Sequence, residues 1–284
     1  MHKVSYAAMR EDGSSIRDRC AAEFSDVTEE GQMAENNRTL GAIYPDDMWL
    51  DYDINRMLDE IRKYLPEQVP MVSARTHVPM FAEDSEPADG SSVELGIWLA
   101  ENGDIEAAAS RLMRLKPSVF AYYCTTASFV QGVAGDEALK KRVEEATGLP
   151  CTTASTAIVK ALHCLGVKRV ATASPYMEDV NQALISFLAE CDIEVVNSNP
   201  LHYLQDHGIV PPETIREAAR RSDVGEADAV LISCTGQKTA DFISELEEEL
   251  GKPVVTSNQA TGWQALQMMG VEPRLPGRGI LFEN

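Results

Sequence analysis

The chain has 284 residues, of which 44% are hydrophobic and 25% charged, the composition of a folded domain or pair of domains rather than of a disordered chain. Its 45 acidic and 25 basic residues give a net charge of −20, which argues against duplex nucleic acid and anionic membranes as partners. No apolar run could span a membrane, and nothing in the first 38 residues resembles a secretory signal. We therefore expect a cytoplasmic protein.

Short apolar runs alternate with segments of helical periodicity from residue 39 onward, after a polar N-terminal extension at 1–38. In the first half the pattern predicts strands at 40–44, 69–72 and 118–123 and helices at 54–64 and 93–115. In the second half it predicts strands at 170–173, 193–196, 229–233 and 254–256 and helices at 153–165, 180–190, 212–221, 240–250 and 261–269. Alternating strands and helices indicate an α/β fold with parallel sheets covered on both faces.

The two halves of the chain contain matching segments. Residues 41–45, Gly-Ala-Ile-Tyr-Pro, match 171–175, Ala-Thr-Ala-Ser-Pro, and both precede a predicted helix. Residues 120–125, Phe-Ala-Tyr-Tyr-Cys-Thr, match 230–235, Val-Leu-Ile-Ser-Cys-Thr. Two matches in the same order favour a duplication, which would place both strand ends, with Cys124 and Cys234, at one cleft between two α/β lobes.

Cys124 and Cys234 are the candidate catalytic residues, because each follows a strand at an equivalent position of the repeat. A helix beginning after such a cysteine would favour its thiolate. We expect the remaining cysteines, which lie at wide spacings without a Cys-x-x-Cys pair, to be small buried apolar residues: Cys20, Cys151, Cys164 and Cys191. Most cysteines of the chain are expected to be free thiols.

Two thiols on opposite sides of a cleft suit racemisation or cis–trans isomerisation, since one can attack or deprotonate carbon while the other returns a proton. The hydroxyls of Thr125, Thr126, Ser128 and Thr235 could bind a carboxylate, although such a residue is more often a plain turn or helix-cap residue. Gly236 would let the backbone approach a ligand closely.

Other chemistries leave little trace in the sequence. No nucleotide-binding glycine motif, zinc-protease motif or serine-hydrolase motif occurs, so we expect neither a cofactor nor a metal. His163 lies within a predicted helix and is expected to be structural. For His207, beside Gly208 in a loop, a structural and a functional role are equally open.

The segments 145–156, 165–170, 175–181, 233–236 and 256–263 together resemble the aspartate/glutamate racemase superfamily. Within it, the chain is similar to the branch of maleate cis–trans isomerases and arylmalonate decarboxylases, over residues 40–284. The resemblance implies two Rossmann-like lobes with parallel sheets related by a pseudo-twofold axis, with the active site between them and no cofactor. We place the first lobe at 39–145, completed by 262–284, and the second at 146–261.

The resemblance also implies roles for individual residues. Cys124 would be the thiol of the first lobe and Cys234 that of the second, and Thr125, Thr126 and Tyr176 would hold a substrate carboxylate. The strand end at Pro45, and Thr235 and Gly236 beside the second thiol, would also line the substrate.

Some residues depart from the pattern of maleate isomerases, which have Pro-Ser-Ser-Asn after the first strand. This chain has Pro45-Asp-Asp-Met48, and Leu204 stands near the place of a second substrate-binding asparagine. Asp46 and Asp47 could equally cap the following helix, and Met48 and Trp49 could line a more apolar pocket.

Arylmalonate decarboxylases have glycine at the first cysteine position, so the presence of both Cys124 and Cys234 favours an isomerase or racemase. We therefore expect a cofactor-independent, maleate-isomerase-like enzyme that acts on a small carboxylic acid. The alternatives are decarboxylation of a substituted malonate, racemisation of an aspartate, glutamate or hydantoin type of substrate, and a non-catalytic small-ligand binder with two lobes. Whether the chain forms a homo-oligomer is left open.

The absence of metal and nucleotide motifs generates a first prediction. Activity should survive dialysis against EDTA, because no motif supplies a metal-ligand cluster. Turnover is measured before and after dialysis. A loss that added metal ions restore would contradict the prediction.

Overall fold

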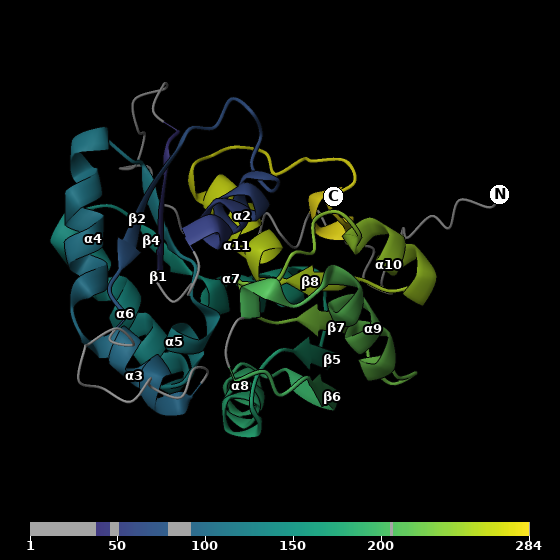
Figure 1. Ribbon diagram of the computed structural model, residues 1–284. Coiled ribbons are helices and arrows are strands. Elements are labelled where there is room, and N and C mark those ends of the chain that lie inside the picture. Colours follow the sequence, from purple (N-terminus) through teal and green to yellow (C-terminus); the bar gives the residue numbers. More distant parts are fainter. Residues whose placement is uncertain (1–37, 46–50, 79–91, 205–206, 284) are drawn as a thin grey trace.

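The computed structural model describes residues 38–45, 51–78, 92–204 and 207–283 (Figure 1). Two four-stranded sheets, in which every recorded strand pair is parallel, form the centre of the fold, with helices packed around them. This arrangement confirms the α/β class expected from the alternation of strands and helices.

The first sheet has the strand order β2-β1-β3-β4. Its strands are β1 Leu40–Pro45, β2 Met71–Thr76, β3 Val119–Tyr122 and β4 Cys151–Thr153. The helices of this half are α2 Asp51–Arg62, α3 Val93–Glu101, α4 Asp104–Leu112, α5 Thr125–Phe129 and α6 Gly132–Thr147, with a 3-10 turn η3 at Met113–Leu115.

The second sheet has the strand order β6-β5-β7-β8. Its strands are β5 Arg169–Ser174, β6 Glu194–Pro200, β7 Ala229–Ile232 and β8 Val254–Thr256. The helices of this half are α7 Ala154–Cys164, α8 Glu178–Glu190, α9 Pro212–Ser222, α10 Ile243–Leu250 and α11 Ser257–Met268, with 3-10 turns η4 His207–Ile209 and η5 Ile280–Phe282.

The two sheets repeat one another strand for strand. β1 lies between β2 and β3, just as β5 lies between β6 and β7. β4 follows β3 at the edge of the first sheet, just as β8 follows β7 at the edge of the second. Just after β3, the Tyr123 N–H donates to the Ile43 carbonyl (2.7 Å), and just after β7 the Ser233 N–H donates to the Ala173 carbonyl (2.9 Å). The matching segments in the sequence therefore occupy matching places in the two sheets.

The hydrophobic core is shared between the two sheets. Alternate residues of β3 face opposite sides, so that Val119 and Ala121 join the largest core cluster while Phe120 and Tyr122 join a smaller one on the other face. The largest cluster also contains Leu231 of the second sheet. One continuous core therefore spans both halves of the chain.

Helices α7 and α11 form the seam between the sheets (Figure 1). α7 follows β4 of the first sheet but contacts β8 of the second, and α11 follows β8 but contacts β3 and β4. Thr153 caps α7 and Thr256 caps α11, each accepting a hydrogen bond from the backbone N–H three residues later. A threonine N-cap therefore begins both seam helices.

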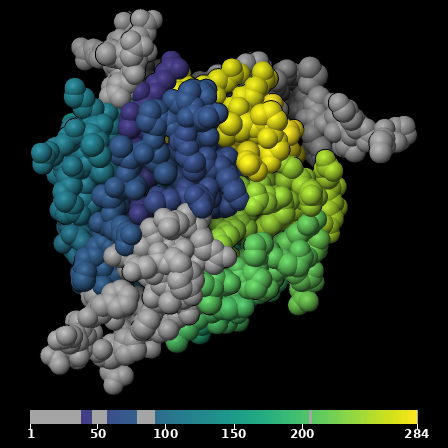
Figure 2. Space-filling model, turned by 45° about the horizontal axis from the view of Figure 1, so that its top comes forward, coloured from purple at the N-terminus to yellow at the C-terminus, as the bar shows by residue number. Residues whose placement is uncertain are grey.

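The C-terminal segment that follows α11 contacts both halves of the chain through Arg278. Arg278 donates through Nε to the Lys63 carbonyl (3.0 Å) and through Nη1 to the Ala240 carbonyl (2.7 Å). In the space-filling view this segment, in yellow, lies against the early blue part of the chain and against the green part (Figure 2). The segment contacts both predicted lobes through Arg278, and its assignment to the first lobe stays a prediction.

The predicted helix at 93–115 is wrong in its continuity, because the chain breaks it after Glu101. Gly103 has a φ of 76°, and the Asn102 side chain accepts a hydrogen bond from the Asp104 N–H (2.8 Å). Asn-Gly is a helix-ending pair, and here it outweighs the continuing apolar periodicity.

Between residues 125 and 153 the structure contains two helices and a strand that the sequence did not predict, α5, α6 and β4. β4 pairs with β3, so residues 151–153 belong to the first sheet, although the predicted boundary after residue 145 assigned them to the second lobe. Three residues carry too little periodicity to reveal a strand. Three predicted helix starts move by three or four residues: α2 begins at Asp51 rather than 54, α10 at Ile243 rather than 240, and α11 at Ser257 rather than 261.

Asp136 of α6 is buried against the start of α7 and accepts hydrogen bonds from the hydroxyls of Thr153 and Thr156. Burial raises the pKa of Asp136 from 3.8 to about 6. The folded protein therefore holds this proton more tightly than the unfolded chain. Its contribution to stability is complete below about pH 4 and is lost as the pH rises to about 6.

We predict that Asp136→Asn abolishes the loss of folding stability that the native protein shows as the pH rises to about 6, because an amide has no charge to bury. Relative to the native protein, the variant should gain about 2–3 kcal/mol of unfolding free energy between pH 4 and pH 7. Urea unfolding at several pH values measures the difference, with the exposed Glu248→Gln as control. An unchanged pH dependence in Asp136→Asn would count against the buried carboxyl.

Candidate active site

β3 and β7 deliver the two candidate thiols to corresponding positions. Cys124 comes two residues after the end of β3 and caps α5 in an extended conformation. Cys234 comes two residues after the end of β7, but no helix begins there, and the Gln237 N–H instead donates to the Cys234 carbonyl in a turn (3.2 Å). Of the two cysteines, only Cys124 is followed directly by a helix, although the sequence analysis considered a helix start after both.

The two Cys-Thr segments are joined directly by hydrogen bonds. The Thr235 hydroxyl donates to the Tyr123 carbonyl (3.2 Å). The Thr125 hydroxyl donates to Ser257 Oγ (3.2 Å), and the same oxygen accepts the Cys234 N–H (2.9 Å). The structure thus brings the two repeats together at one junction, as the duplication predicted.

Both threonine hydroxyls are engaged within this junction. Thr125 and Thr235 are buried, and each donates its proton to a protein acceptor on another segment. In the described state the two side chains connect the halves of the site. Their predicted contact with a substrate carboxylate stays a prediction, and it would require the hydroxyls to turn from these partners.

Tyr176 lies between the two Cys-Thr segments. Its buried hydroxyl hydrogen-bonds with Ser233 Oγ (3.2 Å) and with the Thr125 hydroxyl. Burial, followed by the negative charge of a Cys234 thiolate, raises the pKa of Tyr176 well above its usual value, and Cys124 adds to this more weakly. The phenol is therefore neutral near pH 7 and can donate a hydrogen bond to an anion.

Cys234 has an unusual backbone conformation. Its φ is 132°, a value that L-residues with a side chain rarely adopt. The bond from its N–H to Ser257 and the turn bond to its carbonyl hold it there. Backbone strain of this kind is found where the surrounding structure fixes a side chain for a function.

Gly236 and the turn at His207 approach one another closely. A Cβ atom at position 236 would lie 3.3 Å from the Gly208 nitrogen and 3.5 Å from Cys234 Sγ. We expected the missing side chain of Gly236 to leave room for a ligand. In the structure, backbone atoms of His207 and Gly208 and the sulfur of Cys234 lie at that place. Glycine is suited to this position because the turn packs against it.

The other predicted site residues lie at the same end of the first sheet. Pro45 is the buried last residue of β1 and pairs in register with Thr76. Thr126 is half-buried on α5 with its methyl group toward α3, since a Cβ at Gly96 would come within 2.9 Å of it. Asp46, Asp47, Met48 and Trp49 lie outside the described residues, and Leu204 is exposed.

Two residues of the junction were missed as individual site residues, Ser233 and Ser257. Both lie in segments that carry the family resemblance, Ser233-Cys-Thr-Gly236 and Thr256-Ser-Asn-Gln259. Serine after a strand is common at helix starts, so neither position drew attention by its residue type. The repeat does not indicate Ser257 either, because Thr256 ends β8 as Thr153 ends β4 and the residue that corresponds to Ser257 is Ala154.

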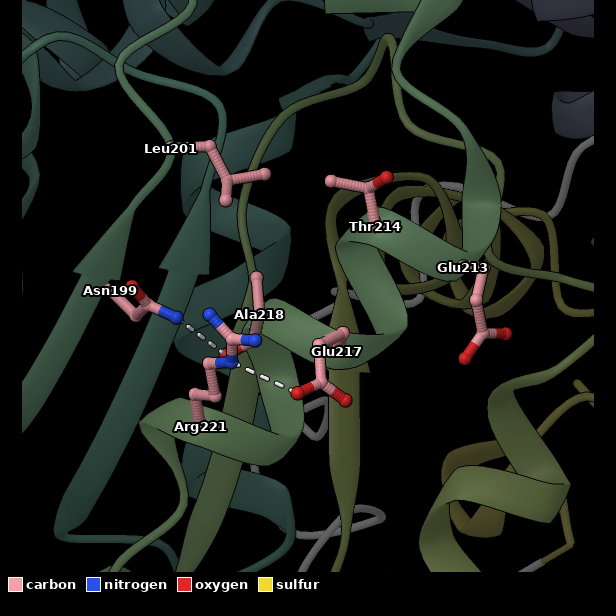
Figure 3. Close-up of a pocket in the computed structure, with 7 residues that line it drawn as sticks. All are labelled: Asn199, Leu201, Glu213, Thr214, Glu217, Ala218 and Arg221. Atoms are coloured by element: carbon pink, nitrogen blue, oxygen red, sulfur yellow. Dashed lines mark hydrogen bonds and ion pairs between the residues drawn. The ribbon is translucent and has the colours of Figure 1, made fainter.

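A separate groove lies between β6 and α9 (Figure 3), lined by Asn199, Leu201, Glu213, Thr214, Glu217, Ala218 and Arg221. Asn199 Nδ2 donates to the Ala218 carbonyl (3.1 Å), and Arg221 Nε donates to Glu217 (2.9 Å). These groups satisfy one another, and neither thiol lines the groove, so we assign no substrate to it.

The described part of the chain contains no group of three or more histidine, cysteine or acidic side chains placed to hold a metal ion. Within those same residues, no helix combines the length and apolar character needed to cross a membrane.

A family model described as arylmalonate decarboxylase matches residues 100–282. The chain belongs to the arylmalonate decarboxylase family. Arylmalonate decarboxylase of Bordetella bronchiseptica is 38% identical over 180 residues, which cover 62% of this chain and 75% of that protein. Maleate isomerase of Pseudomonas putida is 26% identical over 252 residues, which cover 86% of this chain and 96% of the relative.

Solved structures of the arylmalonate decarboxylase family agree with this fold. A liganded variant of arylmalonate decarboxylase, with one glycine changed to cysteine and one cysteine to serine, has a TM-score of 0.74 at 31% identity and covers 87% of this chain and 99% of that one. A maleate isomerase of Pseudomonas putida with maleate has a TM-score of 0.73 at 21% identity, with 86% and 96% of the two chains covered, and shares the fold.

Cys164 is disulfide-bonded rather than a free thiol, which corrects the expectation for this residue. The environments of the free cysteines in this arylmalonate decarboxylase family member predict an order of reactivity. Iodoacetamide should modify Cys234 first, followed by Cys124, and Cys191 and Cys151 more slowly. Burial raises the pKa of Cys191 to about 11 and that of Cys151 further, so both hold little thiolate at neutral pH. Peptide mapping of the labelled protein gives the rates, and equal labelling at all four positions would contradict the assignment.

Proposed function

We propose that the chain is a cofactor-independent isomerase that acts on a small carboxylic acid through Cys124 and Cys234, with maleate-type cis–trans isomerisation as the leading reaction. The observation that carries the proposal is the junction itself. The two Cys-Thr segments are bonded to one another and to Ser257, and the Tyr176 hydroxyl contacts both halves. A non-catalytic binder has no need of two thiols at such a place.

In the proposed reaction the Cys124 thiolate adds to one alkene carbon and forms a C–S bond. The alkene electron pair moves toward the adjoining carboxylate, where the neutral Tyr176 hydroxyl can donate to the developing charge. The Cys234 thiol gives its proton to the second carbon, and the former double bond can then rotate. Removal of that proton by the Cys234 thiolate expels the Cys124 thiolate and forms the trans alkene.

A structural relative supports a covalent route of this kind. A maleate isomerase variant of Nocardia farcinica, with one cysteine changed to serine, was solved with a covalently bound succinylcysteine intermediate. Such an adduct is what addition of a thiol across the double bond of maleate yields. We propose the corresponding adduct on Cys124 of this chain.

Decarboxylation of a substituted malonate is the second candidate, and the higher identity to arylmalonate decarboxylase favours it. There, loss of carbon dioxide would leave an enediolate, and Cys234 would protonate its carbon before regaining a proton from solvent. Cys124 has no necessary part in this reaction, and that difference separates the two candidates.

Replacement of either thiol by serine distinguishes the candidates. For isomerisation, Cys124→Ser and Cys234→Ser should each lower kcat by about 10²–10⁴-fold, and the double variant should be little worse, because the residues act together. For decarboxylation, Cys124→Gly should keep substantial carbon dioxide release while Cys234→Ser loses it. Cys191→Ser is the matched control, since Cys191 is a free thiol outside the junction.

The substrate is sought among maleate, phenyl-substituted malonates and aspartate, each incubated without added cofactor. Proton NMR in deuterated buffer detects isomerisation, decarboxylation and exchange at carbon in one measurement. A Cys124→Gly enzyme fully active on its native substrate would overturn the isomerase proposal. Binding without exchange or turnover would indicate a ligand-binding protein. A cytoplasmic location remains a prediction from the sequence.

A further inference from the structure

His207 and Cys234 form a contact that the reaction described above does not use. The sulfur of Cys234 lies 3.7 Å from Nδ1 of His207, within hydrogen-bonding range for sulfur. Nε2 on the other side of the ring lies 2.9 Å from the Tyr203 carbonyl oxygen. Because a carbonyl only accepts hydrogen bonds, Nε2 carries the ring proton, and Nδ1 of the neutral ring presents its lone pair to the thiol.

The surroundings fix this geometry from several sides. Gln237 Nε2 donates to the His207 carbonyl (2.7 Å), which ties the turn to the segment that follows Cys234. The close approach of Gly236 to the Gly208 nitrogen holds the same two segments together. The imidazole ring also lies 5.9 Å from the Tyr176 ring, measured between centroids. The histidine is therefore held against the junction by backbone, amide and aromatic contacts.

We infer that His207 is a positioning residue for the proposed reaction, which orients the Cys234 thiol and exchanges a proton with it. At rest the pair shares one proton, and its transfer from sulfur to Nδ1 gives a thiolate and an imidazolium. In the protonation step this proton returns to the sulfur and passes to the substrate carbon, which leaves a thiolate beside a neutral ring. When the thiolate later removes a proton from carbon, the pair regains the proton that it gave up. No other reactant is needed, and the tautomer fixed by Tyr203 is the same before and after.

This role assigns different tasks to the two thiols. Cys124, buried at the start of α5, would act as the nucleophile, and Cys234 with His207 would act as the proton carrier. The catalytic part of the inference rests on the proposed function, whereas the pairing of thiol and imidazole does not. The two can therefore be measured separately.

The test compares His207→Gln with His207→Asn. A glutamine amide can still donate to the Tyr203 carbonyl but has no group at the place of Nδ1, and an asparagine oxygen can accept the S–H bond but cannot take its proton. His163→Gln is the matched control, because His163 Nε2 likewise contacts a backbone carbonyl, that of Cys191 (3.1 Å).

We expect both His207 variants to lower the rate of Cys234 alkylation at neutral pH by about tenfold or more, with a matching loss of thiolate ultraviolet absorbance. Labelling of Cys191 in the same samples is the internal reference and should not change. On a substrate found by the screen, kcat should fall by about 10–100-fold while KM changes little. His163→Gln should behave as the native protein in every measurement.

Unchanged labelling of Cys234 in both His207 variants would overturn the inference. So would recovery of native labelling and kcat in His207→Gln, because that result would make the Tyr203 contact, a structural one, the whole role of the residue. Reduced labelling in a protein that turns over no substrate would support the pairing and count against the proposed function alone.

Discussion

The site depends on one serine oxygen. Ser257 Oγ accepts the Thr125 hydroxyl from the first half and the Cys234 N–H from the second, so one buried atom joins the two Cys-Thr segments beside their direct Thr235–Tyr123 bond. Because it is the first residue of α11, its place is determined by the helix that begins there. The geometry of both thiols is therefore coupled to the seam helix rather than to either sheet alone.

α11 can occupy this central place because several of its polar side chains are paired with groups of both halves. Residues 257–266 are all buried, yet the Asn258 amide donates to the Thr235 carbonyl and Gln264 accepts from the Thr152 hydroxyl. A buried polar group with a partner costs little, whereas the same group without one destabilises the fold. The polar side chains of this helix thus connect the two halves while the apolar ones fill the common core.

The sequence revealed the repeated strands and the two thiols, because apolar strands that end in Cys-Thr are strong local patterns. It did not reveal β4, which has three residues, or the break after Glu101, where a local Asn-Gly signal competes with periodicity. Ser257 and the orientation of His207 depend on contacts between segments far apart in the chain. Such contacts follow from tertiary packing and leave no pattern in a single sequence.

The left-handed backbone of Cys234 has a consequence for how the fold can change. A residue with a side chain at a φ of 132° costs about 1–3 kcal/mol, which glycine would not. The chain therefore gives up conformational stability at the position of its second thiol. Replacement of Cys234 by glycine would relieve this strain and stabilise the fold, so stability and the proposed chemistry would oppose each other at this residue.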